Sequence, residues 1–189
     1  MRIIIMGPPG VGKGTEAVVL VKQYHIPHIS TGDIFRELYK DRTTVGKIAK
    51  EYISRGELVP DDITNEIVRH RLNHQDVKNG FLFDGFPRNT LQADALDELL
   101  KSHETEVSAM IALEVDDEVL VQRLLKRGET SGRPDDANES VVRNRIKIYY
   151  KQTAILKNYY FDASKYYGVN GVGSVEDITE RLKAVINNL

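Results

Sequence analysis

The sequence predicts an α/β fold, built as a parallel five-stranded sheet flanked by helices. Short apolar runs alternate with longer stretches in which apolar residues recur every three or four positions, the spacing of an amphipathic helix. The first apolar run leads into the glycine-rich turn GPPGVG, directly before such a stretch. Strands separated by helices join in parallel through right-handed crossovers, and ligands then bind at the carboxyl ends of the strands. The loops that follow strands should therefore hold the functional residues.

The strands and helices are expected in the following order along the chain. The predicted strands are Arg2–Met6, His28–Ser30, Phe81–Asp84, Ser108–Val115 and Tyr166–Asn170. The predicted helices are Lys13–Tyr24, Asp61–Leu72, Thr90–Lys101, Asp117–Lys126, Ser140–Asn158 and Val175–Asn187. Two stretches break the alternation, since residues 30–59 are polar and mostly helical and residues 126–136 are rich in glycine and charge. We expect a core domain of residues 1–29, 60–125 and 137–189, with small insertions at 30–59 and 126–136.

Composition narrows the class of protein. The 189 residues carry a formal net charge of −2, with 41% hydrophobic and 29% charged residues, which gives no sign of nucleic-acid or membrane binding. The chain has no cysteine, so disulfides and cysteine-bound zinc are excluded. No apolar run approaches the roughly 20 residues that span a bilayer, and the N-terminal run is too short for a signal peptide. We expect a cytoplasmic protein.

The stretch MGPPGVGKGT, Met6 to Thr15, has most of the phosphate-binding pattern G-x-x-x-x-G-K-[ST]. Glycines there let backbone N–H groups face an anion at a helix N-terminus, and Lys13 would reach the β- and γ-phosphates of a nucleotide. A plain turn is the alternative, but strand, glycine spacing, lysine and helix all agree. Gly14 replaces the hydroxyl that usually binds Mg²⁺. The metal must then rely on water, the nucleotide and an acid elsewhere, for which Asp84 is best placed.

Five motifs occur in order along the chain and together carry a family resemblance. They are GPPGVGKGT (7–15), STGDIFR (30–36), GELVPD (56–61), DGFPRNTLQ (84–92) and GRPDD (132–136). With them the chain resembles the adenylate kinases, in their short-lid form, over essentially its whole length. The resemblance implies a P-loop NTPase-type fold with a nucleoside monophosphate (NMP)-binding insertion at 30–59 and a short lid at 126–136. It also implies the reaction ATP + AMP ⇌ 2 ADP with Mg²⁺.

On the ATP side, the resemblance implies contacts from the phosphate-binding loop, from two arginines and from a backbone carbonyl near the C-terminus. The implied ATP-binding residues are Gly10, Val11, Gly12, Lys13, Gly14, Thr15, Arg123, Arg127 and Gly173. Asp84 would hold Mg²⁺ through water. Arg123 and Arg127 are four positions apart, so both can lie on one helix face.

On the AMP side, the implied residues come from the insertion, from the DGFPR loop and from the lid. They are Thr31, Arg36, Glu57, Leu58, Val59, Gly85, Phe86, Pro87, Arg88, Gln92, Arg133 and Arg145. Arg36 and Arg88 are expected in loops that converge on the acceptor phosphate, because guanidinium binds phosphate bidentately. The alternative for each is a solvated surface arginine. Gln92 can donate to and accept from an adenine edge.

Transfer of a phosphoryl group needs positioning and positive charge more than a general base. The catalytic set implied by the resemblance is Lys13, Arg88, Arg123, Arg133 and Arg145. Arg143 remains an alternative to Arg145, which we prefer because it directly precedes IKIYY. The short lid has no cysteine, so no structural zinc is expected.

Two competing functions remain open at this point. Uridylate/cytidylate kinases have SAGD where this chain has STGD, so Thr31 favours AMP over UMP or CMP as acceptor. A nucleotide switch that does not transfer phosphate would want a guanine-reading N-K-x-D motif, which the sequence lacks. The expected partners are the small molecules ATP, AMP and ADP, with no nucleic acid and no membrane, and the expected state is a monomer.

Overall fold

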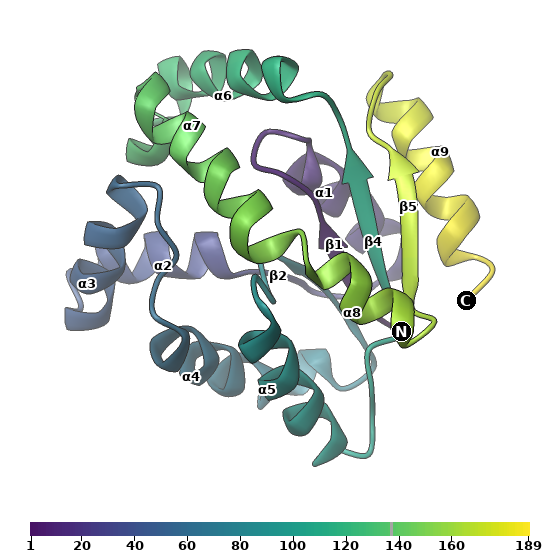
Figure 1. Cartoon of the computed structure of the whole chain (residues 1–189). Coiled ribbons are helices and arrows are strands. Elements are labelled where there is room, and N and C mark those ends of the chain that lie inside the picture. Colours follow the sequence, from purple (N-terminus) through teal and green to yellow (C-terminus); the bar gives the residue numbers. More distant parts are fainter. Residues whose placement is uncertain (137) are drawn as a thin grey trace.

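A computed structural model describes residues 1–136 and 138–189. Its five strands form one all-parallel sheet in the order β2-β3-β1-β4-β5 (Figure 1). The strands are β1 Arg2–Met6, β2 His28–Ser30, β3 Phe81–Asp84, β4 Ala109–Glu114 and β5 Tyr166–Asn170. This confirms the predicted α/β class and places each strand at or within its expected range.

Helices connect and cover the strands. They are α1 Lys13–Tyr24, α2 Thr31–Lys40, α3 Thr44–Ser54, α4 Asp61–Leu72, α5 Thr90–Lys101, α6 Asp117–Ser131, α7 Glu139–Ile148, α8 Leu156–Asp162 and α9 Val175–Ile186. Two 3₁₀ turns, η1 Gln75–Val77 and η2 Pro134–Asp136, and one π-helical turn, η3 Tyr149–Thr153, complete the described part of the chain. Within residues 1–136 and 138–189, no helix combines the length and apolarity needed to cross a bilayer.

The central strand β1 shows how the two faces of the sheet are filled. Its side chains alternate between faces, so Ile3 and Ile5 join one buried cluster while Ile4 and Met6 join the other. The first cluster receives apolar residues from α1, α6, α7 and α9, and the second from α4, α5 and α8. Each face of the sheet is therefore buried, which explains why the strands read as continuous apolar runs.

The stretch 30–59 has a small hydrophobic cluster of its own. Phe35, Ala49 and Val59 are buried together. Helices α2 and α3 cross so closely that a Cβ added at Gly46 would lie 2.2 Å from the carbonyl carbon of Leu38. This tight crossing lets a short segment bury apolar side chains without joining the sheet.

One predicted helix end was wrong, because α6 continues past Lys126 to Ser131. The glycine and charges of RGETS indicated a loop, but Gly128 lies inside the helix, where an added Cβ would lie 2.3 Å from the carbonyl oxygen of Asp136. The absence of a side chain at Gly128 lets α6 pack closely against the backbone of Asp136. The helix ends only at Gly132, whose φ of 62° is left-handed and typical of a C-terminal glycine.

The single helix predicted over Ser140–Asn158 was also wrong. The structure divides it into α7, the π turn η3 and α8. The N–H of Ala154 donates to the carbonyl of Tyr149 at 2.9 Å, five residues earlier, which is the π pattern. Periodicity did not reveal it, because apolar residues recur at helical spacing both before and after the turn. The predicted domain boundary at residue 137 falls outside the described residues.

Candidate active site

The phosphate-binding loop joins β1 to α1, between Met6 and Lys13. Gly7, Gly10 and Gly12 have φ values of 149°, 87° and 109°, which L side chains rarely adopt, and this explains the glycine spacing. The ammonium of Lys13 donates to the carbonyl oxygens of Gly7 and Pro8, at 2.8 and 3.0 Å. The side chain of Lys13 thus folds back over the phosphate-binding loop.

Two charges of opposite sign lie at the start of α1. Burial lowers the pKa of Lys13 from its usual 10.5 to about 8, although the charge of Asp84 acts in the opposite direction. Burial acts against ionisation of the Asp84 carboxyl too, but His28, whose Nε2 lies 3.8 Å from Asp84 Oδ2, and the charge of Lys13 hold its pKa below the usual value. Asp84 is therefore an ionised carboxylate at neutral pH.

Asp84 suits a magnesium ion that arrives with a nucleotide. It ends β3 beside Ile5 of β1, so the parallel register brings it to the same edge as the phosphate-binding loop. A Cβ added at Gly14 would lie 3.7 Å from its Oδ2. An ionised oxygen donor that is 16% exposed and faces a position without a side chain matches the hard oxygen ligands that Mg²⁺ prefers.

Gly85 is the point where the expected acceptor residues meet. Thr31 Oγ1 and Arg88 Nε both donate to the Gly85 carbonyl, at 2.9 and 2.7 Å. The φ of Gly85 is 84°, and an added Cβ would lie 2.9 Å from Arg88 Nη2 and 3.0 Å from Thr31 Oγ1. Only glycine fits this position, because any side chain would displace the arginine.

Gln92 is buried, and part of its amide is already bound. Its Oε1 accepts from the backbone N–H of Arg88 at 2.8 Å, and its Nε2 donates to Asp61 Oδ1 at 2.6 Å. The side chain of Asn89 also donates to Asp61, at 2.9 and 3.1 Å. One N–H and one lone pair of the Gln92 amide therefore remain for a base.

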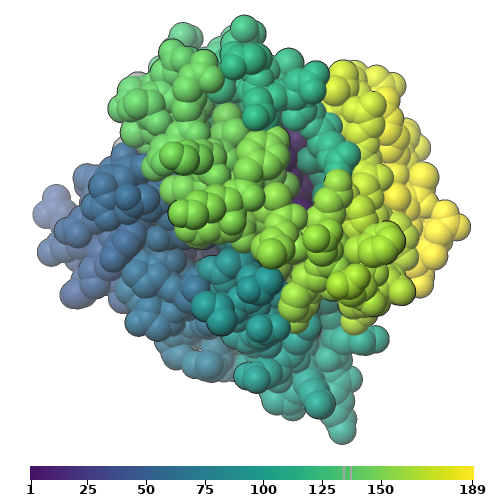
Figure 2. All heavy atoms as spheres, in the orientation of Figure 1, coloured from purple at the N-terminus to yellow at the C-terminus, as the bar shows by residue number. Residues whose placement is uncertain are grey.

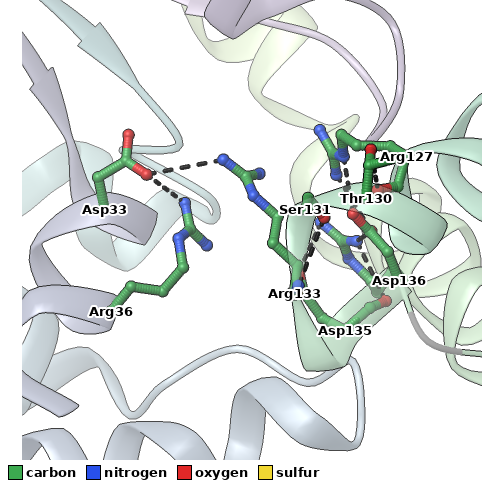
Figure 3. A network of polar contacts seen from close by, with 9 residues as sticks. Asp33, Arg36, Arg127, Thr130, Ser131, Arg133, Asp135 and Asp136 are labelled. Carbon is green, nitrogen blue, oxygen red and sulfur yellow. Dashed lines mark hydrogen bonds and ion pairs between the residues drawn. The ribbon is translucent and has the colours of Figure 1, made fainter. Parts of the chain in front are cut away.

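Arg36 lies on α2 rather than in the expected loop. Its Nη2 bonds Asp33 Oδ1 at 2.6 Å, and Arg133 from the lid approaches the same oxygen at 3.7 Å (Figure 3). The helix N-cap is Ser30, whose hydroxyl accepts from Asp33 N at 3.2 Å. The side chain of Asp33 therefore does not cap the helix. Its carboxylate lies between Arg36 of α2 and Arg133, which belongs to a different segment.

Two carboxylates hold the other lid arginines (Figure 3). Arg127 Nε and Nη2 donate to the two oxygens of Asp136 at 2.7 and 3.1 Å. Arg145 from α7 bonds the same carboxylate and pairs with Asp135 at 3.0 Å. Asp135 and Asp136 are 4% and 1% exposed. The negative charges of Asp135 and Asp136 offset part of the repulsion between the neighbouring guanidiniums of Arg127 and Arg145.

Most of these groups line one cavity of about 830 Å³ at the carboxyl edge of the sheet. In Figure 2, purple atoms of the N-terminal part of the chain are visible through an opening beside the green segment. Every residue predicted to bind ATP, AMP or the metal lies on this lining, including the loop residues Glu57, Leu58 and Val59, and Gly173 near the C-terminus. The structure thus brings together segments from 7 to 173 along the chain.

Comparison with known proteins gives the same result as the motifs. A family model described as adenylate kinase matches residues 5–165. The chain is 50% identical to an adenylate kinase of Flavobacterium psychrophilum over 189 residues, which is 100% of both chains. The chain belongs to the adenylate kinase family. It is a phosphotransferase, a nucleoside monophosphate kinase.

Other relatives bear the same name. The chain is 48% identical to an adenylate kinase of Flavobacterium johnsoniae, over 100% of both chains. It is 42% identical to one of Parabacteroides distasonis, over 100% of this chain and 99% of that protein. The similarity therefore extends over residues 30–59 and 126–136 as well as over the rest of the chain.

For an adenylate kinase site, the choice between Arg143 and Arg145 depends on geometry. Arg143 is half-exposed and pairs with Glu139 and Glu118, at 2.8 and 3.2 Å. Arg145 is only 16% exposed in its side chain and lines the cavity. The structure places Arg145, as preferred from the sequence, where it can reach a nucleotide.

Several residues of this adenylate kinase site were missed from the sequence. Asp135 and Asp136 hold lid arginines, Asp61 orients Gln92, and the hydroxyl of Thr153 donates to the Arg88 carbonyl at 2.7 Å. An adjacent pair of acids in GRPDD, two residues after an arginine, was the available signal for residues 126–136. Asp61 and Thr153 gave none, because their partners lie 31 and 65 residues away.

Proposed function

We propose that this chain transfers the terminal phosphoryl group of ATP to AMP, giving two ADP, and that the residues lining the cavity carry the reaction. One observation carries the proposal. The phosphate-binding loop with Lys13 and the Arg88 cluster at Gly85 line the same cavity, with the lid arginines also on its lining. A single-nucleotide switch would not use the second cluster.

On the donor side, the N–H groups of the loop and Lys13 bind the ATP phosphates. Arg123 and Arg127, on one face of α6, add positive charge over the γ-phosphate. The backbone near Gly173 holds the adenine. Thr15 stands where it can contact phosphate, since Gly14 offers no side chain.

On the acceptor side, Arg36 and Arg88 bind the AMP phosphate, and Gly85, Phe86 and Pro87 let it approach the backbone. Gln92, Thr31 and the backbone of residues 57–59 hold the adenine. The Gln92 amide is oriented for this by Arg88 N and Asp61. A site that offers designed hydrogen bonds to one base rejects bases that leave them unmade.

Mg²⁺ accompanies ATP as part of the substrate. When bound, the ion neutralises charge between the β- and γ-phosphates. Asp84 would hold it through water, because this carboxylate is ionised, lines the cavity and is adjacent to Gly14.

In the transfer step, an oxygen of the AMP phosphate forms the new bond to the γ-phosphorus. The bond from that phosphorus to the β–γ bridging oxygen breaks, and its electron pair stays on the ADP that leaves. Lys13, Arg88, Arg123, Arg133 and Arg145 stabilise the charge spread over the transferred group. No proton needs to move, so no general base is assigned.

The lid residues 126–136 exclude water from this step, which prevents loss of the phosphoryl group to hydrolysis. Asp135 and Asp136 would keep Arg127 and Arg145 aligned as the lid closes. We propose the domain boundaries predicted from the sequence, with the NMP-binding unit at 30–59. We also propose a cytoplasmic monomer whose partners are nucleotides and not nucleic acid, which light scattering and a nucleic-acid binding assay can test.

An acceptor panel tests the function. The purified chain is incubated with Mg-ATP and, separately, AMP, dAMP, UMP or CMP, and ADP is measured. We expect AMP to be the best acceptor. Rapid turnover of UMP or CMP without turnover of AMP would replace the proposal with a pyrimidine nucleotide kinase. ATP hydrolysis without transfer to any acceptor would favour a nucleotide switch.

A further inference from the structure

Arg88 is held by hydrogen bonds at its backbone as well as its side chain. Its N–H donates to Gln92 Oε1 at 2.8 Å, and its Nε donates to the Gly85 carbonyl at 2.7 Å. Its own carbonyl accepts from Thr153 Oγ1 at 2.7 Å. The first two partners lie within four residues of Arg88, whereas Thr153 lies 65 residues away and belongs to a different element.

Thr153 reaches Arg88 because it closes the π turn η3. A threonine hydroxyl in an ordinary helix bonds the carbonyl three or four residues earlier in the same helix. Here the Tyr149 carbonyl accepts from the N–H of Ala154 at 2.9 Å. The extra residue of the turn rotates the following positions by about 100°. The Thr153 hydroxyl thereby leaves its own helix and points to another segment.

The position of Thr153 makes this contact sensitive to substitution. Thr153 is 6% exposed and lines the nucleotide cavity. Without its hydroxyl, the Arg88 carbonyl would lose its side-chain partner, and leaving a partly buried acceptor unpaired is costly. The backbone of Arg88 would then be held only from its own loop.

The same helical path carries a second arginine of the site. Arg145 lies on α7, which runs directly into η3 and then α8, as the bent green path in Figure 1 shows. Burial and then the charge of Arg145 are the main causes that lower the pKa of Arg88. The guanidiniums of Arg88 and Arg145, which have like charge, therefore face one site. The continuous path from α7 to η3 carries Arg145 and, through Thr153, also holds the backbone of Arg88.

We propose that Thr153 is a positioning residue for phosphoryl transfer. Its hydroxyl, delivered by the π turn, fixes the backbone of Arg88 relative to α7 and so sets the separation of Arg88 and Arg145 around the acceptor phosphate. This inference rests on the proposed function, since it concerns how the AMP phosphate is held. In this proposal Thr153 acts through Arg88 and makes no contact of its own with the reacting groups.

The test compares Thr153→Val with Thr153→Ser, since valine has nearly the same shape without the hydroxyl and serine keeps the hydroxyl. We expect Thr153→Val to lower kcat/KM for AMP by about 10-fold to 100-fold, because misplacing a catalytic group by about 1 Å has an effect of that size. KM for ATP should change less than about twofold. Thr153→Ser should remain within about threefold of the wild type. Thr153→Ala serves as a second variant without the hydroxyl if the valine chain does not fold.

Thr105→Val is the matched control. Thr105 also donates its hydroxyl to a carbonyl, that of Leu100 at 3.2 Å, far from the cavity lining. It should leave the kinetics for AMP unchanged. A purely structural role for Thr153 would lower the thermal midpoint of Thr153→Val and leave its KM for AMP unchanged, which would overturn the inference.

A double-mutant cycle with Arg88→Ala makes the test sharper. If Thr153 acts through Arg88, adding Thr153→Val to Arg88→Ala should lower kcat/KM for AMP by less than about twofold. Full additivity would overturn the inference, as would wild-type kinetics in Thr153→Val or equal losses in the valine and serine variants. A wild-type chain that forms no ADP from ATP and AMP would instead overturn the proposed function.

Discussion

Replacing Asp136 with asparagine tests whether a buried carboxylate organises the lid. Asp136 is 1% exposed. It accepts two hydrogen bonds from Arg127, at 2.7 and 3.1 Å, and a further one from Arg145. Asparagine keeps the shape of the side chain and one acceptor oxygen. It removes the negative charge and places an amide NH₂ against guanidinium N–H groups.

The magnitude follows from burial. Removing one partner of a buried ion pair costs about 3–5 kcal/mol, because the other charge is left without compensation. The Arg127 side chain is 38% exposed and can be rehydrated, so the lower end, about 3 kcal/mol, applies. For a chain of this size that loss lowers the thermal midpoint by roughly 6–12 °C. Misplaced lid arginines should also lower kcat about 100-fold.

The assay pairs urea unfolding with the steady-state rate of ADP formation. Asp76→Asn is the matched control, because Arg71 holds Asp76 with the same forked geometry at 2.8 and 2.7 Å, while the Asp76 side chain is 51% exposed. An exposed pair contributes less than about 1 kcal/mol. The control should therefore change stability little and leave the kinetics as they are.

The reasoning fails if the two variants lose similar stability. The two forked pairs differ in burial and in the additional contact of Asp136 with Arg145, and an equal loss would mean that neither sets the strength of the Asp136 contacts. A stable Asp136→Asn chain with a wild-type rate would show that the lid arginines need no carboxylate to stay in place.

Two further predictions concern the cations of the site. Arg88→Ala should lower kcat/KM for AMP by about 10²–10⁴-fold in the same assay, since it removes the guanidinium that binds the acceptor phosphate. The pKa of Lys13 is lowered to about 8, so the free enzyme loses this positive charge as pH rises through 8. The pH profile of kcat/KM for Mg-ATP should then fall about tenfold per unit above that point. Lys13→Arg should remove the fall, because guanidinium stays charged to above pH 12.

Each of these predictions has a clear opposing result. An Arg88→Ala chain with near wild-type turnover of AMP would remove Arg88 from the acceptor site. A profile for Mg-ATP that stays flat to pH 9.5 would mean that Lys13 keeps its proton in the free enzyme, or that it does not bind phosphate.

The placement of strands and of most helices could be predicted from the sequence for a simple physical reason. Strands buried on both faces are continuous apolar runs, and Phe81–Asp84 and Arg2–Met6 are of this kind. The helix ends near Lys126 and within 140–158 could not be predicted. They depend on Gly128 packing against Asp136 and on the π turn at Tyr149–Thr153.

The nucleotide-facing residues could be expected together because each follows a strand or belongs to an insertion at the same edge of the sheet. Parallel topology brings those loops together whatever their distance along the chain. The anchors of the site are different. Asp61, Asp136 and Thr153 act through side chains that meet only when α4, the lid and η3 pack around the cavity.

By itself, the sequence determined the fold class and the family and predicted two nucleotide sites, because these depend on local periodicity and on the identity of short motifs. Only the tertiary structure decided that Arg145 rather than Arg143 faces the cavity, that paired aspartates hold the lid arginines, and that Thr153 anchors Arg88. Each depends on distances of about 3 Å between groups far apart in the chain. Hydrogen bonds and buried ion pairs form only at such distances, so no pattern along the sequence could contain them.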